Sequence, residues 1–287
     1  HTTWRNVPDR HHSMRAVFDQ TWKLLKDDER HLFQRLSVFR GSFQREAAEQ
    51  VAGASLHLLS ALADKSLLRQ DGGGRYQMHE LLRQYAQEKL EQRPEEALAI
   101  RWAFLNYWAA FMKTRETDIT GVRQRDVLNE VTAELENIRV AWSQAVEYGD
   151  LDFLQNASQP IYEYYDLQGR YQEGIPTTER AIARLEELER NDERDGALAL
   201  LLSQAGWHYI RVGRFDDART AFTRSRSLFE ALGIAPPSGF GTNPLNGLAL
   251  LSVVLGDYAT AIQIGEQARQ ENEAQGDARN LQVSFYV

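Results

Sequence analysis

Residues 66–78 read SLLRQDGGGRYQM, and this stretch decides the fold of the N-terminal part of the chain. Two short strand-like runs, 66–70 and 75–78, flank Asp71-Gly72-Gly73-Gly74. Glycine adopts positive φ at little cost, so glycines between such runs are typical of a β-hairpin. A phosphate-binding loop is the rival interpretation, but it requires Gly-Lys-Ser/Thr and a helix directly after the glycines, and neither follows. The sequence therefore predicts a two-stranded hairpin.

Four short helices are predicted before this hairpin. Apolar residues recur at helical spacing from Met14 to Leu25, and a second helix follows Asp27-Asp28-Glu29, which supplies N-cap chemistry, and ends at Gly41-Ser42. Residues 46–51 and 56–63 give a third and a fourth helix. Helices followed by a two-stranded wing describe a winged helix, a small α+β domain that we place at residues 10–92.

Many winged helices bind DNA through the helix that precedes the wing. Here that helix falls within residues 54–62, which contain one histidine and no arginine, lysine, asparagine or glutamine to contact base edges. DNA binding through the winged helix is therefore the weakest of the functional alternatives, and nucleic acid is not an expected partner.

Several runs in this part of the chain resemble the winged-helix segment of bacterial STAND regulators, the signal-transduction ATPases with numerous domains related to NB-ARC, LuxR-type and SARP-type proteins. These runs are RHLFQRLSVFRG at 30–41, DKSLL at 64–68, MHELLRQYA at 78–86 and ELENIRVAW at 134–142. The resemblance spans roughly residues 10–190. It implies a transcriptional regulator or other signal-transduction protein in which a winged helix docks on an ATPase domain and a helical superhelix senses an inducer.

Met78-His79-Glu80 is similar to the Met-His-Asp motif of the NB-ARC proteins, whose histidine contacts the β-phosphate of ADP. The resemblance implies that His79 latches an ADP-bound, closed state in the full-length protein, although Glu80 replaces the aspartate. The alternative is that His79 only caps or packs at a strand-to-helix junction. The chain itself has no phosphate-binding loop, so we expect ADP or ATP only in the full-length protein and no cofactor in this part of it.

The second half of the chain contains an internal repeat. Gly169-Arg170-Tyr171, Gly213-Arg214-Phe215 and Gly256-Asp257-Tyr258 recur at spacings of 44 and 43 residues, with small residues at matching positions around them. Small side chains let paired helices approach closely, as in tetratricopeptide (TPR) repeats. We therefore predict a mainly α protein in which connecting helices at 93–155 lead to a right-handed α-α superhelix of TPR-like repeats at 156–287.

The first helix of each repeat is expected to face a concave groove that binds a protein, a peptide or a small-molecule inducer. The predicted groove residues are Glu163, Asp166, Trp207, Ile210, Arg211, Asn246 and Leu250. Trp207 could equally be a core residue, and Tyr209 is expected in the core. The insertion at residues 236–241 is either a functional loop or a plain spacer. A scaffold that binds its partner constitutively, without a switch, remains the main alternative function.

The composition of the chain argues against several further classes of protein. The chain has no cysteine and a formal net charge of −8; residues 1–92 carry +2, so the rest carries −10 and would repel nucleic acid. No catalytic motif or metal-ligand spacing appears, so neither an enzyme nor a metal site is predicted. No apolar run is long enough for a membrane span, and we expect a cytoplasmic protein. The chain starts without methionine and stops within an apolar periodic stretch, which favours a fragment of a longer protein.

Overall fold

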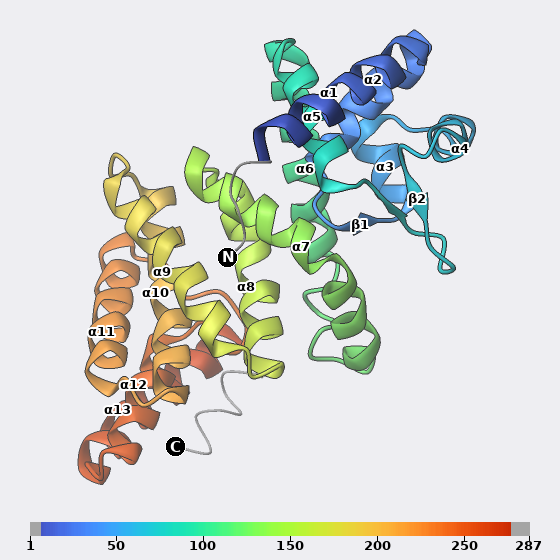
Figure 1. Cartoon of the computed structure of the whole chain (residues 1–287). Helices are drawn as coiled ribbons and strands as arrows, with labels where there is room; N and C mark the ends of the chain where they lie inside the picture. Colours follow the sequence, from blue (N-terminus) through green and yellow to red (C-terminus); the bar gives the residue numbers. More distant parts are fainter. Residues whose placement is uncertain (1–6, 277–287) are drawn as a thin grey trace, which may run out of the picture. The chain divides into compact units, whose positions relative to one another are not determined.

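The computed structural model describes residues 7–276 and divides into two compact units (Figure 1). The winged-helix unit contains the residues up to 108 together with 132–141. The repeat unit contains residues 109–131 and those from 142 onward. The described residues are mainly α-helical, with one small sheet in the winged-helix unit and a helical-repeat region after it, which confirms the predicted fold class.

Short helices build the winged-helix unit. They are α1 (Val7–Leu24), α2 (Asp27–Arg35), the 3-10 turn η2 (Leu36–Val38), α3 (Arg45–Ala52), α4 (Leu56–Asp64) and α5 (Glu80–Glu91). The core is formed by fully buried apolar side chains from α2, η2 and α4, such as Phe33, Leu36 and Leu62. Trp22 joins α1 to this core, because its ring lies 6.1 Å from Tyr85 and 6.4 Å from Phe33.

The start of α2 differs from the prediction in one detail. Lys26 is the N-cap residue, and the Glu29 carboxylate accepts a hydrogen bond from its backbone N–H at 2.8 Å. Asp27 and Asp28 instead occupy the first helical turn, where negative charge is favourable next to the helix dipole.

The wing is confirmed as a hairpin and is extended by a strand that the sequence did not reveal. β2 (Arg69–Gln70) and β3 (Tyr76–Gln77) pair antiparallel, with Gln70 opposite Tyr76. β1 (Ser42–Phe43) pairs with the other edge of β3, so the strand order is β1-β3-β2. Gly41-Ser42 was predicted only as a helix end. Two residues are too few to show the alternating pattern that marks a strand.

A segment of the later helix α7 (Gln124–Tyr148) fastens this sheet. The Arg75 guanidinium donates to the Ser42 carbonyl at 3.0 Å and to the Glu134 carboxylate at 2.5 Å. The Asn137 side chain accepts from the Arg40 backbone N–H at 2.8 Å and donates to the Ser42 carbonyl at 2.9 Å. Hydrogen bonds to α7 therefore hold the wing against the rest of the winged-helix unit.

Two long helices are each divided between the units. α6 (Pro94–Lys113) begins in the winged-helix unit and ends in the repeat unit, while only residues 132–141 of α7 belong to the winged-helix unit. The stretch predicted as connecting helices, 93–155, is thus shared by both units.

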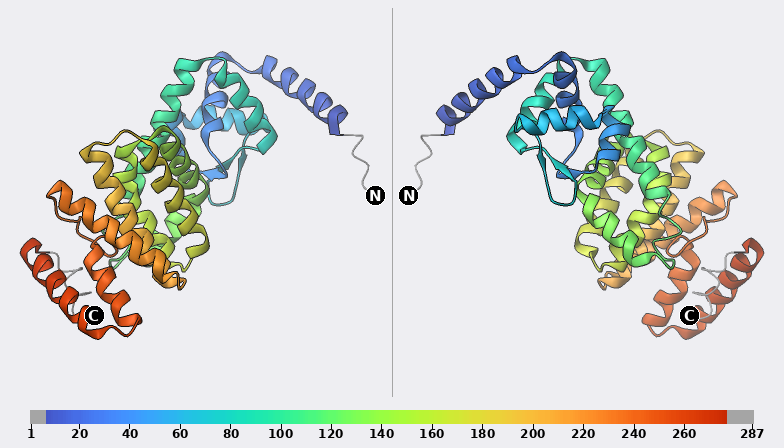
Figure 2. Two further views of the ribbon diagram at one scale, coloured as in Figure 1. Left: turned by 90° about the vertical axis from the view of Figure 1, so that its left-hand side faces the viewer. Right: turned by 90° about the vertical axis from the view of Figure 1, so that its right-hand side faces the viewer.

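Three pairs of helices form the repeat region (Figure 2). The pairs are α8 (Leu151–Leu167) with α9 (Tyr171–Glu187), α10 (Asp192–Arg211) with α11 (Phe215–Leu232), and α12 (Pro244–Val254) with α13 (Tyr258–Gln275). The repeated glycines Gly169, Gly213 and Gly256 lie in the turns within the pairs.

The small residues of the repeat lie where the paired helices touch. Ala218, Ser225 and Ala268 are buried on the second helices. Gly206 on α10 faces the ring of Phe222 on α11 so closely that an added Cβ would lie 2.6 Å from it. A larger side chain at position 206 would therefore force the two helices apart.

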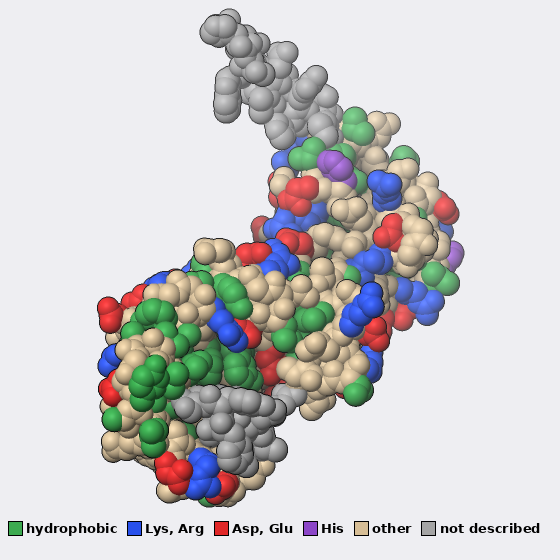
Figure 3. Space-filling model, turned by 90° about the horizontal axis from the view of Figure 1, so that it is seen from below, with side chains coloured by type: hydrophobic (Ala, Val, Ile, Leu, Met, Phe, Trp, Pro, Cys, Tyr) green, Lys and Arg blue, Asp and Glu red, His purple; other side chains and the backbone are tan. Residues whose placement is uncertain are grey.

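Apolar side chains remain exposed on α13 and the turn before it, among them Leu255, Tyr258 and Ile262. Figure 3 shows hydrophobic side chains gathered on the repeat region in the view from below. The further helix predicted from Ala278 to Val287 lies outside the described residues.

Between residues 7 and 276, no helix is long and apolar enough to cross a membrane. In the same part of the chain, no group of three or more histidine, cysteine or acidic side chains is arranged to hold a metal ion.

Candidate partner-binding surface and the His79 position

The first helices of the three pairs, α8, α10 and α12, carry all seven predicted groove residues. α10 packs against both of the other two helices. Residues 233–243, which connect α11 to α12, fold back onto α8 and α10. We call this connection the inner-face loop, and we call the surface of α8 and α10 that it contacts the inner face.

Phe240 is the centre of this contact. Its ring lies 4.7 Å from the ring of Trp207 on α10 and 6.4 Å from that of Tyr162 on α8, stacked at 25° on the latter. Tyr162 in turn lies 4.7 Å from His208. The inner face therefore holds an aromatic side chain of the loop between aromatic side chains of two different helices.

Hydrogen bonds from the inner face hold the backbone of the loop. Gln159 donates through Nε2 to the Phe240 carbonyl at 2.8 Å, and the Ser203 hydroxyl donates to the Gly241 carbonyl at 2.8 Å. Gln204 supports this arrangement, because its Nε2 donates to Oε1 of Gln159 at 2.9 Å. Side chains of α8 and α10 thus bind main-chain carbonyls, as they would those of a peptide.

The predicted groove residues divide into two groups. Glu163, Trp207 and Asn246 are buried, with exposed fractions of 2%, 3% and 1%. The structure places them in the interior of the repeat unit rather than on an open groove, because the inner-face loop and neighbouring helices leave no room for solvent. Tyr209 is also buried, as predicted, and its hydroxyl donates to Glu179 at 2.9 Å.

The second group comprises Asp166, Ile210, Arg211 and Leu250, which are partly or fully exposed. Arg211 donates through Nε to Asp166 at 3.2 Å, which ties α10 to α8. These four side chains keep the access to solvent that binding requires. Partner binding by any of the seven residues stays a prediction.

His208 stands beside this ion pair and is completely buried. Burial is the main cause that lowers the pKa of its imidazole to about 4, with Asp166 raising and Arg211 lowering it less. The ring is therefore neutral at pH 7. The Tyr162 hydroxyl and Nε1 of Trp207 are buried without a hydrogen-bond partner among the described residues.

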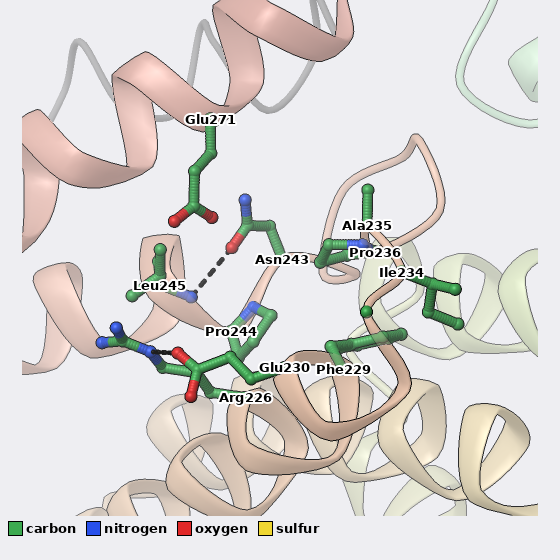
Figure 4. Close-up of a pocket in the computed structure, with 11 residues that line it drawn as sticks. Arg226, Phe229, Glu230, Ile234, Ala235, Pro236, Asn243, Pro244, Leu245 and Glu271 are labelled. Carbon is green, nitrogen blue, oxygen red and sulfur yellow. Dashed lines mark hydrogen bonds and ion pairs between the residues drawn. The ribbon is translucent and has the colours of Figure 1, made fainter. Parts of the chain in front are cut away.

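A pocket of about 260 Å³ lies where the two ends of the inner-face loop join α11 and α12 (Figure 4). Ile234 and Pro236 line it from one end of the loop, and Asn243 from the other. Asn243 also caps α12, because its Oδ1 accepts from the Leu245 N–H at 2.9 Å. The Arg226–Glu230 ion pair forms part of the wall.

In the winged-helix unit, His79 is the N-cap residue of α5. Its Nδ1 accepts a hydrogen bond from the Leu81 N–H at 3.3 Å, and its side chain is exposed. A neutral ring with Nδ1 as acceptor carries its proton on Nε2. The capping role considered from the sequence is therefore present, and it leaves an N–H donor facing solvent at a helix N-terminus.

Glu80, which replaces the aspartate of the related motif, binds two arginine side chains of the winged-helix unit. It accepts two hydrogen bonds from Arg83, each at 2.8 Å, and one from Arg40 at 3.0 Å. The bonds from Arg83 are the main cause that lowers the pKa of Glu80 to about 2. Arg83 is buried and also donates to the Ser37 carbonyl at 3.2 Å.

The helix that would read DNA, α4, exposes Leu56 and His57. DNA binding through this helix stays the weakest of the functional alternatives.

The sequence did not predict that Gln159 and Ser203 bind the inner-face loop, or that Phe240 is the centre of its contact. Glutamine and serine are common on helices, so these two residue types did not indicate a binding role. The one available clue was an aromatic residue between two glycines in a proline-containing insertion.

Comparison with protein families shows that residues 25–91 fit the model of a winged helix-turn-helix domain. None of the curated proteins matches the chain. Among solved structures, the chain is similar to a STAND protein with a tetratricopeptide repeat sensor from Pyrococcus horikoshii, with 15% identity and a TM-score of 0.36. That alignment covers 94% of this chain and 48% of the other, so the chain spans about half the length of that protein. The comparisons thus identify residues 25–91 as a winged helix-turn-helix domain.

Proposed function

We propose that this chain is the regulatory and sensor part of a STAND-type signal-transduction ATPase. In this proposal the winged-helix unit docks on an ATPase domain elsewhere in the full-length protein and holds it closed with ADP bound. The TPR-like repeat unit binds a protein, a peptide or a small-molecule inducer. Binding shifts the balance between closed and open states because the ligand prefers one of them.

The observation that carries the proposal is the state of His79. A histidine that already uses Nδ1 to cap its helix keeps Nε2–H free at the exposed N-terminus of α5. Such a position suits a phosphate group. The winged-helix match and the Met78-His79-Glu80 motif support the same function, and Glu80 fixes the start of the helix through Arg83.

The test is the affinity of the full-length protein for ADP, measured by calorimetry for the wild type and for His79→Ala. We expect the substitution to weaken ADP binding at least tenfold and to raise basal activity. His57→Ala is the matched control, because His57 is an exposed histidine of the same unit with no role in the proposal. His79→Asn restores a good N-cap and separates capping from phosphate contact.

Unchanged ADP affinity in His79→Ala would remove the latch. A full-length protein that binds no ADP would favour the constitutive scaffold instead, with the repeat unit as its only binding surface.

A further inference from the structure

We propose that the inner-face loop is a displaceable occupant of the inner face, and that a partner replaces it with an extended segment carrying an aromatic residue between small residues. This inference rests on the proposed function in that the repeat unit binds a protein partner. It adds the site on that unit, the recognition chemistry and the competitor that controls access.

The seating of the loop shows what the inner face recognises. The two hydrogen bonds from Gln159 and Ser203 end on main-chain carbonyls, which every peptide has. The only large side chain of the loop on the inner face is Phe240, held near Tyr162 and Trp207. Main-chain bonds with one aromatic anchor are a common mode of peptide recognition.

The residues next to Phe240 define the neighbours that the site accepts. A Cβ on Gly241 would lie 2.6 Å from the Tyr162 ring, and its φ of +84° disfavours other residues. A Cβ on Gly239 would lie 3.1 Å from Nε2 of Gln159. The backbone on both sides of the aromatic residue therefore lies directly on α8, which requires small residues there.

The loop leaves buried polar groups of the inner face without partners. These are Nε1 of Trp207 and the hydroxyl of Tyr162. Polar groups buried without a hydrogen bond destabilise the closed arrangement. A partner segment that brings an acceptor to Trp207 or Tyr162 would gain an interaction that the loop does not make, and could therefore displace it.

The ends of the loop can stay in place while its middle leaves. Gly233 ends α11 in the left-handed conformation, and Asn243 caps α12 and donates to Asn272 at 2.8 Å. The nine residues between these anchors can move without unwinding either helix. The pocket at the loop ends already leaves open space beside Ile234 and Pro236.

A partner can bind only while the inner face is open. The apparent affinity therefore equals the intrinsic affinity multiplied by the fraction of molecules in which the loop has left the inner face. A substitution that weakens the loop alone should therefore strengthen binding of an external segment. This distinguishes a displaceable occupant from a permanent part of the core.

Thiol labelling measures the opening directly, because the chain has no cysteine. Ser203→Cys places a thiol beneath the loop, at a completely buried position whose hydroxyl bonds to Gly241. Ser225→Cys is the matched control. It is equally buried in the same unit, but its hydroxyl donates to the Ala199 carbonyl of α10, away from the loop.

We expect Ser203→Cys to react with a thiol reagent at least tenfold faster than Ser225→Cys. Adding Phe240→Ala should accelerate the first about tenfold further and leave the second unchanged. Global unfolding would expose both thiols together, so a variant that merely folds poorly raises both rates. Equal rates for the two thiols, or a rise of both with Phe240→Ala, would overturn the proposal.

The probe for the partner segment is a synthetic peptide with the loop sequence IAPPSGFGTN, residues 234–243. In the Phe240→Ala background it should slow labelling of Ser203→Cys and bind at least tenfold more tightly than to the wild type. The same peptide with alanine in place of phenylalanine should do neither. Absence of protection by the loop peptide would overturn the recognition chemistry. No step involves nucleotide, so these results stand or fall separately from the ADP measurement.

Discussion

Two polar clusters, one in each unit, differ in how completely their hydrogen bonds are made. In the winged-helix unit, the Glu80 carboxylate forms ion pairs with Arg83 and Arg40 and is partly exposed to water. In the repeat unit, Tyr162 and Trp207 are buried, yet the Tyr162 hydroxyl and Nε1 of Trp207 have no hydrogen-bond partner among the described residues. The first cluster has the features of a structural joint. The second has the features of a binding site filled by a substitute, because folding alone favours apolar or fully bonded groups there.

The largest expected effect comes from removing the ring that contacts Phe240. Trp207→Ala should lower the free energy of unfolding of the repeat unit by about 3–5 kcal/mol, since it empties a large buried volume. Trp207→Phe keeps an aromatic ring and removes a smaller volume together with the N–H, so it should cost clearly less. Urea denaturation with hydrogen exchange as the readout separates the two units. Equal losses for both variants would show that this N–H contributes to stability.

Lowering the pH should also destabilise the two units to different extents. The pKa of His208 is about 4 in the fold against an ordinary 6.5, so its neutral form stabilises the repeat unit above pH 6.5. That contribution, about 3 kcal/mol, is lost as the pH falls from 6.5 to 4 because the unfolded chain binds the proton first. Glu80, with a pKa of about 2 against 4.5, loses its smaller, solvent-screened contribution only between pH 4.5 and 2.

Hydrogen exchange at pH 7.5, 5.5 and 4.5, corrected for the intrinsic rates, should therefore show the repeat unit weakening before the winged-helix unit. His208→Phe should flatten the response of the repeat unit in this range. The charged and titratable groups around His208 are Asp166, Arg211, Tyr162 and Tyr171. An unchanged pH response in His208→Phe would show that His208 does not cause the loss of stability.

In the winged-helix unit, Arg83→Met should cost about 2 kcal/mol, because it removes charge-assisted hydrogen bonds to Glu80 and leaves the Ser37 carbonyl without its donor. Glu80→Gln should cost less, since Glu80 is half exposed and water can replace it. Chemical denaturation of both variants tests this order. A larger loss for Glu80→Gln would contradict the view that buried Arg83 organises the joint.

The smallest effect is expected from His79→Ala in this chain. It removes one long capping bond at an exposed helix start and should cost no more than about 1 kcal/mol. Thermal unfolding of the single variant measures it. A loss of several kcal/mol would mean that His79 is a core structural residue, which would weaken its proposed role toward phosphate.

Local patterns predicted much of the fold. Three glycines between strand-like runs marked the hairpin at β2 and β3, and the spacing of the motifs at Gly169, Gly213 and Gly256 indicated the repeat of helix pairs. The assignment of groove residues was less successful. Helical periodicity placed Glu163, Trp207 and Asn246 on the correct helices, but it does not reveal what covers a face. Three of the seven predicted side chains are consequently buried.

The amino-acid pattern alone was enough to predict where most helices lie, where the wing turns, and that the helices of the second half pair in a repeat. These properties depend on backbone preferences and on spacing within a few residues. Packing in three dimensions was needed to show that β1 joins the wing, that Arg75 and Asn137 connect the wing to α7, and that the inner-face loop folds onto α8 and α10. The hydrogen bonds in these contacts join residues 33 to 97 positions apart. The energy of these contacts depends on surfaces that form only after the helices have packed, so no local sequence pattern predicts them.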